Sequence, residues 1–235
     1  GMRGVGAGPD AEAAYAPVVM ERSGVRVAFV AFSDFFNQHP SDDGAIAAHL
    51  PDEARVAAAL ARARAEADVV VAAVHWSRDF AMAARRRERA HARRLVEAGA
   101  DVILGTGPHV LHAVERLESP RGEAVVAYSL GNVASGMGRS YRVGRRPPTG
   151  IHPANVRPEA RDGAVLRIAL ALDDGVRVTA LSADPLWTRN NWLAHVTDDA
   201  PHRVSVVRLS DAAPEVRAER RPAIARALGG AVTLP

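Results

Sequence analysis

Short apolar runs alternate with helix-forming segments along the first half of the chain. Residues 25–33 and 68–74 are rich in valine, with phenylalanine or alanine, which is typical of buried strands. Residues 52–67 are made almost entirely of strong helix formers, and residues 82–98 are rich in Arg and Ala and end at Gly99. Both of these segments therefore predict helices, the second with a glycine C-cap.

The order of these segments predicts a parallel sheet. Residues 101–105 are a third apolar run, separated from 68–74 by one predicted helix. A strand, a helix and a second strand at this spacing form a crossover unit, so the strands 68–74 and 101–104 should be parallel and close in one sheet. Residues 124–130 predict a further strand behind a turn at 119–122. The pattern indicates an α/β fold.

The second half of the chain is less regular. Residues 131–161 are rich in Gly, Pro and Arg and have no period, which predicts a long irregular loop. Residues 165–172 and 176–182 alternate apolar and polar positions around a short turn, which predicts a hairpin. Residues 214–228 are helical in composition, and we expect Pro222 to interrupt that helix.

Composition narrows the class of protein. The chain has 235 residues, of which 48% are hydrophobic and 24% charged, values typical of a globular domain. We expect one domain over residues 1–235. The longest apolar run, residues 69–74, is far shorter than the roughly 20 residues of a membrane-spanning helix. The sequence contains no cysteine, which excludes disulfides and thiolate chemistry.

The basic character of the chain comes from arginine alone. All 30 basic residues are Arg, the net charge is +3 and the pI is about 10.1. The arginines are interleaved with Asp and Glu, as on an ordinary solvated surface, so we expect no nucleic-acid binding. The arginines of segment 82–98 are expected to form a solvated helix face. No signal peptide is visible, and localisation cannot be inferred from this end of the chain.

Two histidines follow neighbouring strands of the predicted sheet. His75 comes directly after one parallel strand, and His109 lies in the loop after the next one. Because ligands of open α/β sheets bind at the carboxyl ends of the strands, both imidazoles are candidate catalytic residues and metal ligands. The alternative, that each is an ordinary hydrogen-bonded loop histidine, has equal weight from position alone.

Other residues at this edge suggest different chemistry. Ser129 is a possible nucleophile of a Ser/His/Asp triad, but its surroundings lack the G-x-S-x-G elbow of hydrolases. The loop 105–107 offers backbone N–H groups to a phosphate without the nucleotide-binding glycine-lysine motif. Gly131 and Asn132 are explained by turn chemistry. Trp187 and Trp192 are expected to pack against the sheet.

Several motifs in order resemble one known family. They are HWSRDF at 75–80, AGADVILG at 98–105 leading to PHV at 108–110, and YSLGN at 128–132. They resemble those of bacterial CapA-type capsule-synthesis proteins, which make poly-γ-glutamate and belong to the calcineurin-like metallophosphoesterase superfamily. With GVGAG at 4–8 and the strand 25–33, the resemblance covers roughly residues 4–190.

The resemblance implies a metallophosphatase-like sheet sandwich flanked by helices, with a two-metal site at the strand ends. His75 would match the lone metal-binding histidine, and His109 the last histidine of the G-H-x-H-like motif. The implied cofactor is a divalent metal (Mn, Fe or Zn), and the implied partner is a phosphoester substrate or an anionic polymer. Further candidate ligand-binding residues are Trp76, Thr106, Gly107 and Asn132.

Two departures from the family pattern lead to an incomplete site. Thr106 and Gly107 stand where the family often has histidines, and the family's first half, with an aspartate, a glutamate and an Asn-Asn-His segment, has no counterpart here. We therefore expect an incomplete metal site, an N-terminally incomplete fold, and a chain that is weakly active or inactive alone. The alternatives are a non-catalytic anion- or polymer-binding module and an unrelated α/β hydrolase. The resemblance also suggests cell-envelope association of the intact protein.

An incomplete sandwich would leave a sheet edge unpaired, which favours association between chains. We expect either a homodimer through that edge or its coverage by the chain's own amino-terminal segment.

Overall fold

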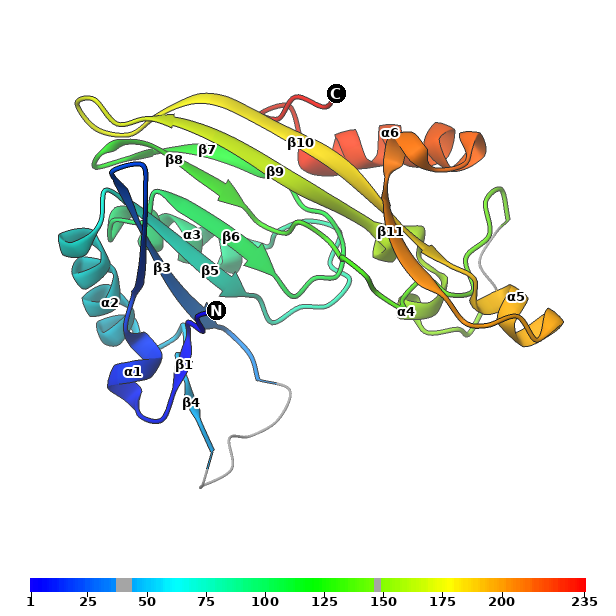
Figure 1. Cartoon of the computed structure of the whole chain (residues 1–235), viewed down its shortest axis with the longest axis horizontal. Helices are drawn as coiled ribbons and strands as arrows, with labels where there is room; N and C mark the ends of the chain where they lie inside the picture. The colour runs from blue at the N-terminus through cyan, green and yellow to red at the C-terminus, as the bar shows by residue number, and fades with distance from the viewer. Residues whose placement is uncertain (37–43, 146–148) are drawn as a thin grey trace.

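A computed structural model describes residues 1–36, 44–145 and 149–235. Its central element is a six-stranded sheet with the order β2-β3-β5-β6-β8-β7 (Figure 1). The bounds are β2 Val18–Arg22, β3 Val25–Ser33, β5 Val69–His75, β6 Val102–Thr106, β7 Val114–Ser119 and β8 Gly122–Ala127. Strands β3, β5, β6 and β8 are parallel, and β2 and β7 are antiparallel at the two edges. The predicted parallel pairing of β5 with β6 is confirmed.

Helices cover one face of this sheet. They are α1 Ala11–Tyr15, α2 Glu53–Glu66 and α3 Arg86–Glu97. Alternate residues of the strands, such as Val30 and Val70, pack with Leu60 of α2 and Leu95 of α3 in one core. This period of two along a strand divides the sheet into a helix side and an opposite side.

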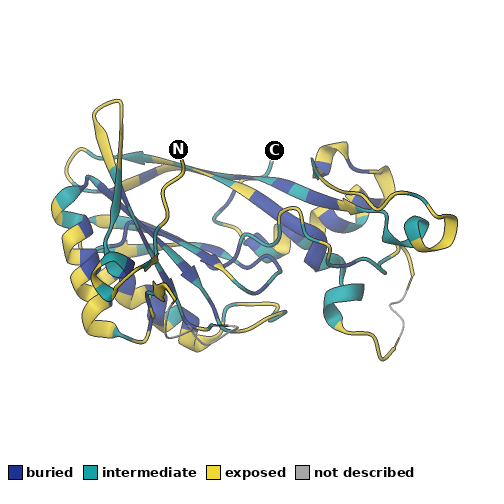
Figure 2. Ribbon diagram, turned by 60° about the horizontal axis from the view of Figure 1, so that its bottom comes forward, coloured by how far each residue is buried: buried dark blue, intermediate teal, exposed yellow. Residues whose placement is uncertain are grey.

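A second sheet covers the opposite side. It consists of β9 Asp162–Ala171, β10 Arg177–Asn190 and β11 Val204–Arg208, in the order β11-β10-β9 and all antiparallel. Ile168 and Leu170 of β9 pack against Val69 and Val71 of β5. The expected α/β fold, with a sheet sandwich flanked by helices, is confirmed. Figure 2 shows the buried residues concentrated where the layers meet.

The long β9–β10 hairpin also holds the carboxyl-terminal helix. Helix α6, Pro214–Leu228, buries Ile224 and Leu228 with Leu181 and Trp187 of β10. Our expectation that Pro222 interrupts this helix was wrong, because α6 continues through it. Pro222 is exposed, and the buried residues on either side of it keep the helix packed against the hairpin.

Helix α3 begins four residues later than predicted. Phe80 has a left-handed backbone with φ 53°, and Arg85 is an extended N-cap residue. The Glu88 carboxylate accepts the Arg85 backbone N–H at 2.5 Å, which fixes the start of the helix at Arg86. Residues 82–85 therefore belong to the loop that follows β5.

Several short elements lack a sequence pattern. They are β1 Ala7–Gly8, β4 Ile46–Ala47, α4 Pro153–Val156, α5 Trp192–Asp198 and the 3₁₀ turns Pro158–Arg161 and Leu209–Asp211. The predicted irregular loop 131–161 contains α4 and the first 3₁₀ turn, and its residues 146–148 lie outside the described residues. No helix of the described chain has the length and apolar character needed to cross a membrane.

The amino-terminal segment covers the edge of β3. Strand β2 pairs with β3 along its whole length, from Val18 opposite Phe29 to Arg22 opposite Val25. Beyond β2, the Arg3 guanidinium donates a hydrogen bond of 3.0 Å to the Val19 carbonyl. Of the two outcomes expected for this edge, coverage by the chain itself is therefore present. A homodimer stays a prediction, and it now concerns the outer edge of β2.

Candidate functional site at the carboxyl edge of the sheet

The central strands end in a row of polar residues. In the parallel register, Ser33 of β3 lies beside His75 of β5, and His75 lies beside Thr106 of β6. The backbone N–H of Trp76 then donates to the Thr106 carbonyl at 2.9 Å, which keeps the two strand ends together. The edge predicted from the sequence therefore exists, and it carries His75.

His75 belongs to the side of the sheet that faces the second sheet. It follows Val69 and Val71 at every second position, and those valines pack under β9. The ring is half-buried, and its Nδ1 is a buried atom with no hydrogen-bond partner within the described residues. A buried imidazole nitrogen without a partner is uncommon in a structural histidine.

His109 is held by two side chains. Its backbone has φ 61°, in the left-handed region. Its Nδ1 lies 3.0 Å from Oδ1 of Asn132, and the ring of Phe80 stacks on the imidazole with centroids 5.6 Å apart. The Phe80 N–H donates to the Pro108 carbonyl at 2.9 Å, which fixes the stacking partner next to the His109 loop. His109 therefore has a defined ring orientation.

The two histidines have separate surroundings. Across the described parts of the chain, no hydrogen bond or ring contact joins His75 to His109, and no group of three or more His, Asp or Glu side chains is placed to hold a metal ion. Two-metal phosphoesterase centres need carboxylate as well as imidazole ligands. The residues of 1–36, 44–145 and 149–235 taken alone do not fit a dinuclear centre.

Glycines let the edge pack closely. A Cβ on Gly107, whose φ is 105°, would lie 2.4 Å from the Trp76 carbonyl oxygen. Thr106 is exposed, and its hydroxyl is 3.4 Å from the Val74 carbonyl. The ligand-binding roles expected of Thr106, Gly107 and Asn132 remain predictions.

Trp76 does not suit its expected role as a ligand-binding residue. Its side chain points to the helix side of the sheet and is 1% exposed. The indole N–H donates a hydrogen bond of 2.9 Å to the Tyr128 carbonyl. Trp76 thus joins β5 to β8 within the core, because alternation along the strand turns it away from the face that carries His75.

Ser129 lies in a buried turn. It is 1% exposed, and its hydroxyl accepts the Gly131 N–H at 3.3 Å. The hydroxyl thus has a turn-forming role, which argues against the triad alternative.

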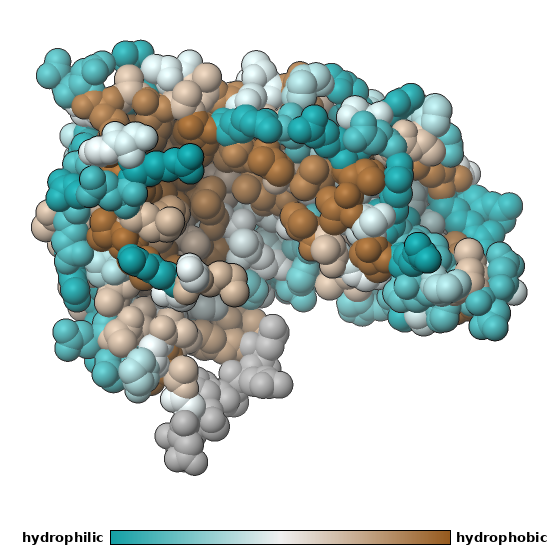
Figure 3. All heavy atoms as spheres, viewed as in Figure 1, coloured by the Kyte–Doolittle hydropathy of each residue, from teal (hydrophilic) through white to brown (hydrophobic). Residues whose placement is uncertain are grey.

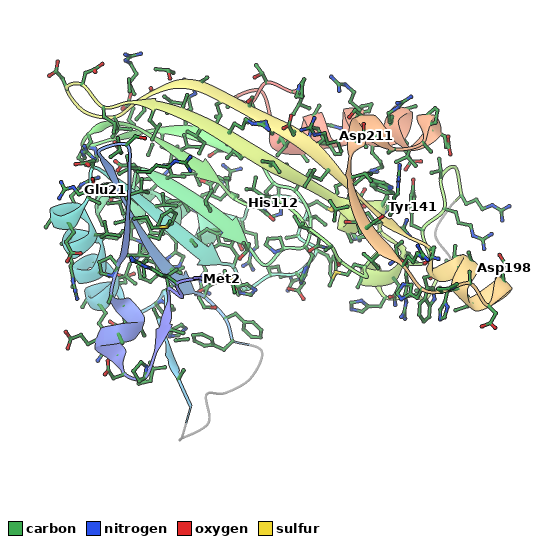
Figure 4. All side chains as sticks on the ribbon, viewed as in Figure 1. Met2, Glu21, His112, Tyr141, Asp198 and Asp211 are labelled. Carbon is green, nitrogen blue, oxygen red and sulfur yellow. The ribbon has the colours of Figure 1, made fainter. Side chains whose placement is uncertain are left out.

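Sequence reasoning missed three residues around His109. Phe80 stacks on the His109 ring, and the Ala160 carbonyl accepts a hydrogen bond from Asn132, the partner of that ring. Both residues lie in segments without a period. His112 is buried three residues after His109, and its Nε2 donates to the Ala81 carbonyl at 2.6 Å (Figure 4). Burial lowers the pKa of His112. The His-x-x-His spacing was the available signal for His112.

A buried ion pair lies behind Asn132. The Asn132 N–H donates to the Asp162 carbonyl at 3.1 Å, and the Asp162 carboxylate accepts from the Arg220 guanidinium at 2.6 Å. Burial raises the pKa of Asp162 to about 7, and Arg220 opposes that rise. This pair connects the beginning of β9 to α6 next to the site.

The arginines of α3 are more than a solvated face. Three of them and the N-cap residue Arg85 pair with carboxylates, namely Arg85 with Glu88, Arg87 with Asp34, Arg89 with Glu115 and Arg94 with Glu53. Asp34 directly follows β3 and is almost fully buried, so the Arg87 pair ties α3 to the carboxyl edge of the sheet.

Trp187 packs in the core as expected, whereas Trp192 lies in α5 under the Arg139 guanidinium.

Two curated proteins are similar to parts of this sequence. Over 73 residues the chain is 38% identical to the PGA biosynthesis protein CapA of Bacillus subtilis (strain 168). The matched segment covers 31% of this chain and 18% of that protein. Over 138 residues it is 33% identical to the capsule biosynthesis protein CapA of Bacillus anthracis, covering 54% of this chain and 31% of that protein. The chain thus spans less than a third of the length of these relatives.

A solved structure of a hypothetical protein from Thermus thermophilus aligns with 72% of this chain and 61% of that one, at 20% identity and a TM-score of 0.41. The family model described as bacterial capsule synthesis protein PGA_cap matches residues 1–137, which is more than half of the chain and includes His75, His109 and Asn132. The chain belongs to the bacterial capsule synthesis protein family.

Proposed function

We propose that this chain is the part of a capsule-biosynthesis protein that presents His75 and His109 to a phosphoester or anionic-polymer substrate, and that it is weakly active or inactive as a hydrolase alone. One observation carries the proposal. The carboxyl edge supplies two imidazoles, with Thr106 and Gly107 beside them, and within the described residues they share no hydrogen bond or ring contact and belong to no group of three or more metal-binding side chains.

The expected chemistry of a complete site follows from the family resemblance. A divalent ion (Mn, Fe or Zn) would supply Lewis-acid activation for attack of water on a phosphoester. Because the donors in the described part of the chain do not complete such a site, His75 and His109 are proposed here as groups that orient the substrate or move a proton. Association of the intact protein with the cell envelope is part of the same proposal.

Hydrolysis of a chromogenic phosphodiester by the purified chain, with Mn²⁺ and with chelator, tests this proposal. We expect little or no turnover above that of the His75→Ala, His109→Ala double variant. Ser129→Ala should match the unaltered chain, because the Ser129 hydroxyl is part of a buried turn. Fast Mn²⁺-dependent turnover that the double variant abolishes would contradict the proposed inactivity. Chelator-resistant turnover that requires Ser129 would indicate a serine hydrolase.

A second candidate is a non-catalytic module that binds an anionic polymer. Residues 124–158 contain no Asp or Glu and five arginines, at positions 139, 142, 145, 146 and 157. Asn132, the partner of His109, lies within this stretch. An acid-free, arginine-rich stretch of sequence that includes Asn132 favours a polycarboxylate or polyphosphate ligand.

Binding of fluorescent poly-glutamate tests this candidate. We expect salt-sensitive binding that weakens in the Arg142→Ala, Arg157→Ala variant. The variant Arg55→Ala, Arg62→Ala removes the same charge from α2 and is the matched control. Equal weakening in both variants would show attraction by net charge alone and would remove the case for this module.

A further inference from the structure

The side-chain amide of Asn132 has only one orientation that satisfies its neighbours. Its Nδ2 is 2.9 Å from the Ala160 carbonyl and 3.5 Å from the Met137 sulfur, and both of these atoms accept hydrogen bonds. A carbonyl oxygen can only accept, so the NH₂ group must face Ala160. Oδ1 of Asn132 consequently faces His109, at 3.0 Å from Nδ1.

This orientation determines which nitrogen of His109 carries the proton. Oδ1 of an amide only accepts, so a hydrogen bond at 3.0 Å requires a proton on Nδ1 of His109. A neutral imidazole has one N–H, and Nε2 is then the unprotonated nitrogen with a lone pair. The partner of one ring nitrogen thus sets the chemistry of the other.

Two backbone contacts hold the Asn132 main chain against the beginning of β9. Asn132 N–H donates to the Asp162 carbonyl at 3.1 Å, and Gly131 and Gly163 form a β-bridge next to it. Phe80 stacks on the imidazole of His109. Asn132 thus contacts Ala160 just before β9 and His109 at the same time, so one side chain joins the beginning of β9 to the orientation of His109.

We propose that Asn132 is the positioning residue of this site: it holds His109 as the Nδ1–H tautomer and so makes Nε2 a hydrogen-bond acceptor toward the substrate. The inference rests on the proposed function for the role of His109. It narrows the ligand class, because a neutral Nε2 accepts from a protonated oxygen, such as water or a phosphate hydroxyl. A fully ionised carboxylate offers no proton to it.

Nitrogen-15 NMR of the full chain, at a pH where the imidazole is neutral, tests the proposal without reference to activity. The His109 signals are assigned by their loss in His109→Gln. We expect the unaltered chain to show Nδ1–H and an unprotonated Nε2. Asn132→Ala should lower the Nδ1–H fraction, whereas Asn132→Asp, which keeps an acceptor oxygen, should retain it.

Asn190→Ala is the matched control. Asn190 donates to the Gly136 carbonyl of the same loop at 3.0 Å, and its Oδ1 faces His202 and not His109. This variant should leave the His109 tautomer unchanged. An Nε2–H tautomer in the unaltered chain, or equal effects of Asn132→Ala and Asn190→Ala, would overturn the inference. If Asn132→Ala fails to fold, the unaltered chain and Asn132→Asp still decide it. Absence of hydrolysis with the expected tautomer would leave this inference standing and would bear on the reaction alone.

Discussion

At the scale of single residues, the site depends on glycines that admit close backbone contacts. A Cβ on Gly105 would lie 2.1 Å from the Tyr128 carbonyl oxygen and 2.4 Å from the Trp76 indole nitrogen. These are the two atoms that form the hydrogen bond between β5 and β8. Gly105 thus permits the strands that carry the site to approach one another.

Gly105→Ala is expected to destabilise the fold by about 3 kcal/mol, since the added methyl must displace buried backbone in a packed core. Gly136→Ala is the control, because among the described residues other than its chain neighbours nothing lies within 4 Å of its Cβ position. Chemical denaturation of both variants measures the difference. A loss at Gly105 as small as that at Gly136 would show that the strands are not held so closely.

The buried His112 predicts acid sensitivity. Burial lowers its pKa below the ordinary value of 6.5, so the unfolded chain binds a proton more readily than the folded chain. Stability from this group is complete above about pH 6.5 and is lost as the pH falls through the lowered pKa. His112→Gln, which keeps a donor for the Ala81 carbonyl, should reduce the fall in unfolding free energy between neutral and acidic pH. An unchanged pH dependence would mean that His112 titrates as in the unfolded chain.

At the scale of elements, one carboxylate connects helix α2, strand β5 and the β7–β8 turn. Asp101 is 1% exposed and accepts from the Val70 N–H at 2.8 Å. It also pairs with Arg64 of α2 at 2.6 Å and with Arg121 of the β7–β8 turn at 3.2 Å. Helix α2 and the turn are therefore fixed to β5 by a single buried group.

Asp101→Asn is expected to cost about 3 kcal/mol, because it leaves two arginines without their buried partner. Asp68→Asn, which alters the exposed pair with Arg26, should change stability little. Thermal and denaturant unfolding of the two variants give the comparison. Equal losses of unfolding free energy would contradict the conclusion that the buried pairs of Asp101 stabilise the fold more than the exposed pair of Asp68.

The elements that could be predicted from the sequence are those whose pattern is local. Strand β3 has the bounds expected from its apolar run, and α2, β5 and β6 lie within a residue of theirs. These elements follow local periodicity. The start of α3 depends on Phe80 and Glu88, and continuation of α6 through Pro222 depends on packing against β10, which periodicity does not report. His75 and His109 could be found because parallel strands bring their carboxyl ends to one edge of the sheet. The contact between Asn132 and Ala160 joins residues 28 positions apart in a segment without a period, so no local pattern predicts it.

At the scale of the whole molecule, the face seen in Figure 3 carries a continuous band of apolar side chains along β9 and the sheet beneath it. Val27, Phe29 and Leu104 of the central sheet are only partly buried, and Val165 of β9 is 46% exposed. Strand β2 is an edge strand of this central sheet, and its outer edge is where we expect a second copy to pair. Arg3 occupies one backbone carbonyl of that edge.

Arg3→Ala should raise the dimer fraction, because it frees the Val19 carbonyl for pairing between chains. Arg22→Ala removes the same charge from β2 and leaves that carbonyl covered. Sedimentation velocity at a series of concentrations measures both. A dimer fraction that is equal in the two variants would exclude the edge of β2 as the point of association.

The central proposal is that this member of the capsule synthesis family presents His75 and His109 without the donors of a two-metal centre, since the described residues contain no group of three or more metal-binding side chains. Elemental analysis of the chain after saturation with Mn²⁺ or Zn²⁺ and gel filtration tests it most directly. We predict a retained metal content close to zero, unchanged in the His75→Ala, His109→Ala variant. Retention of about two ions per chain, lost in that variant, would contradict the account.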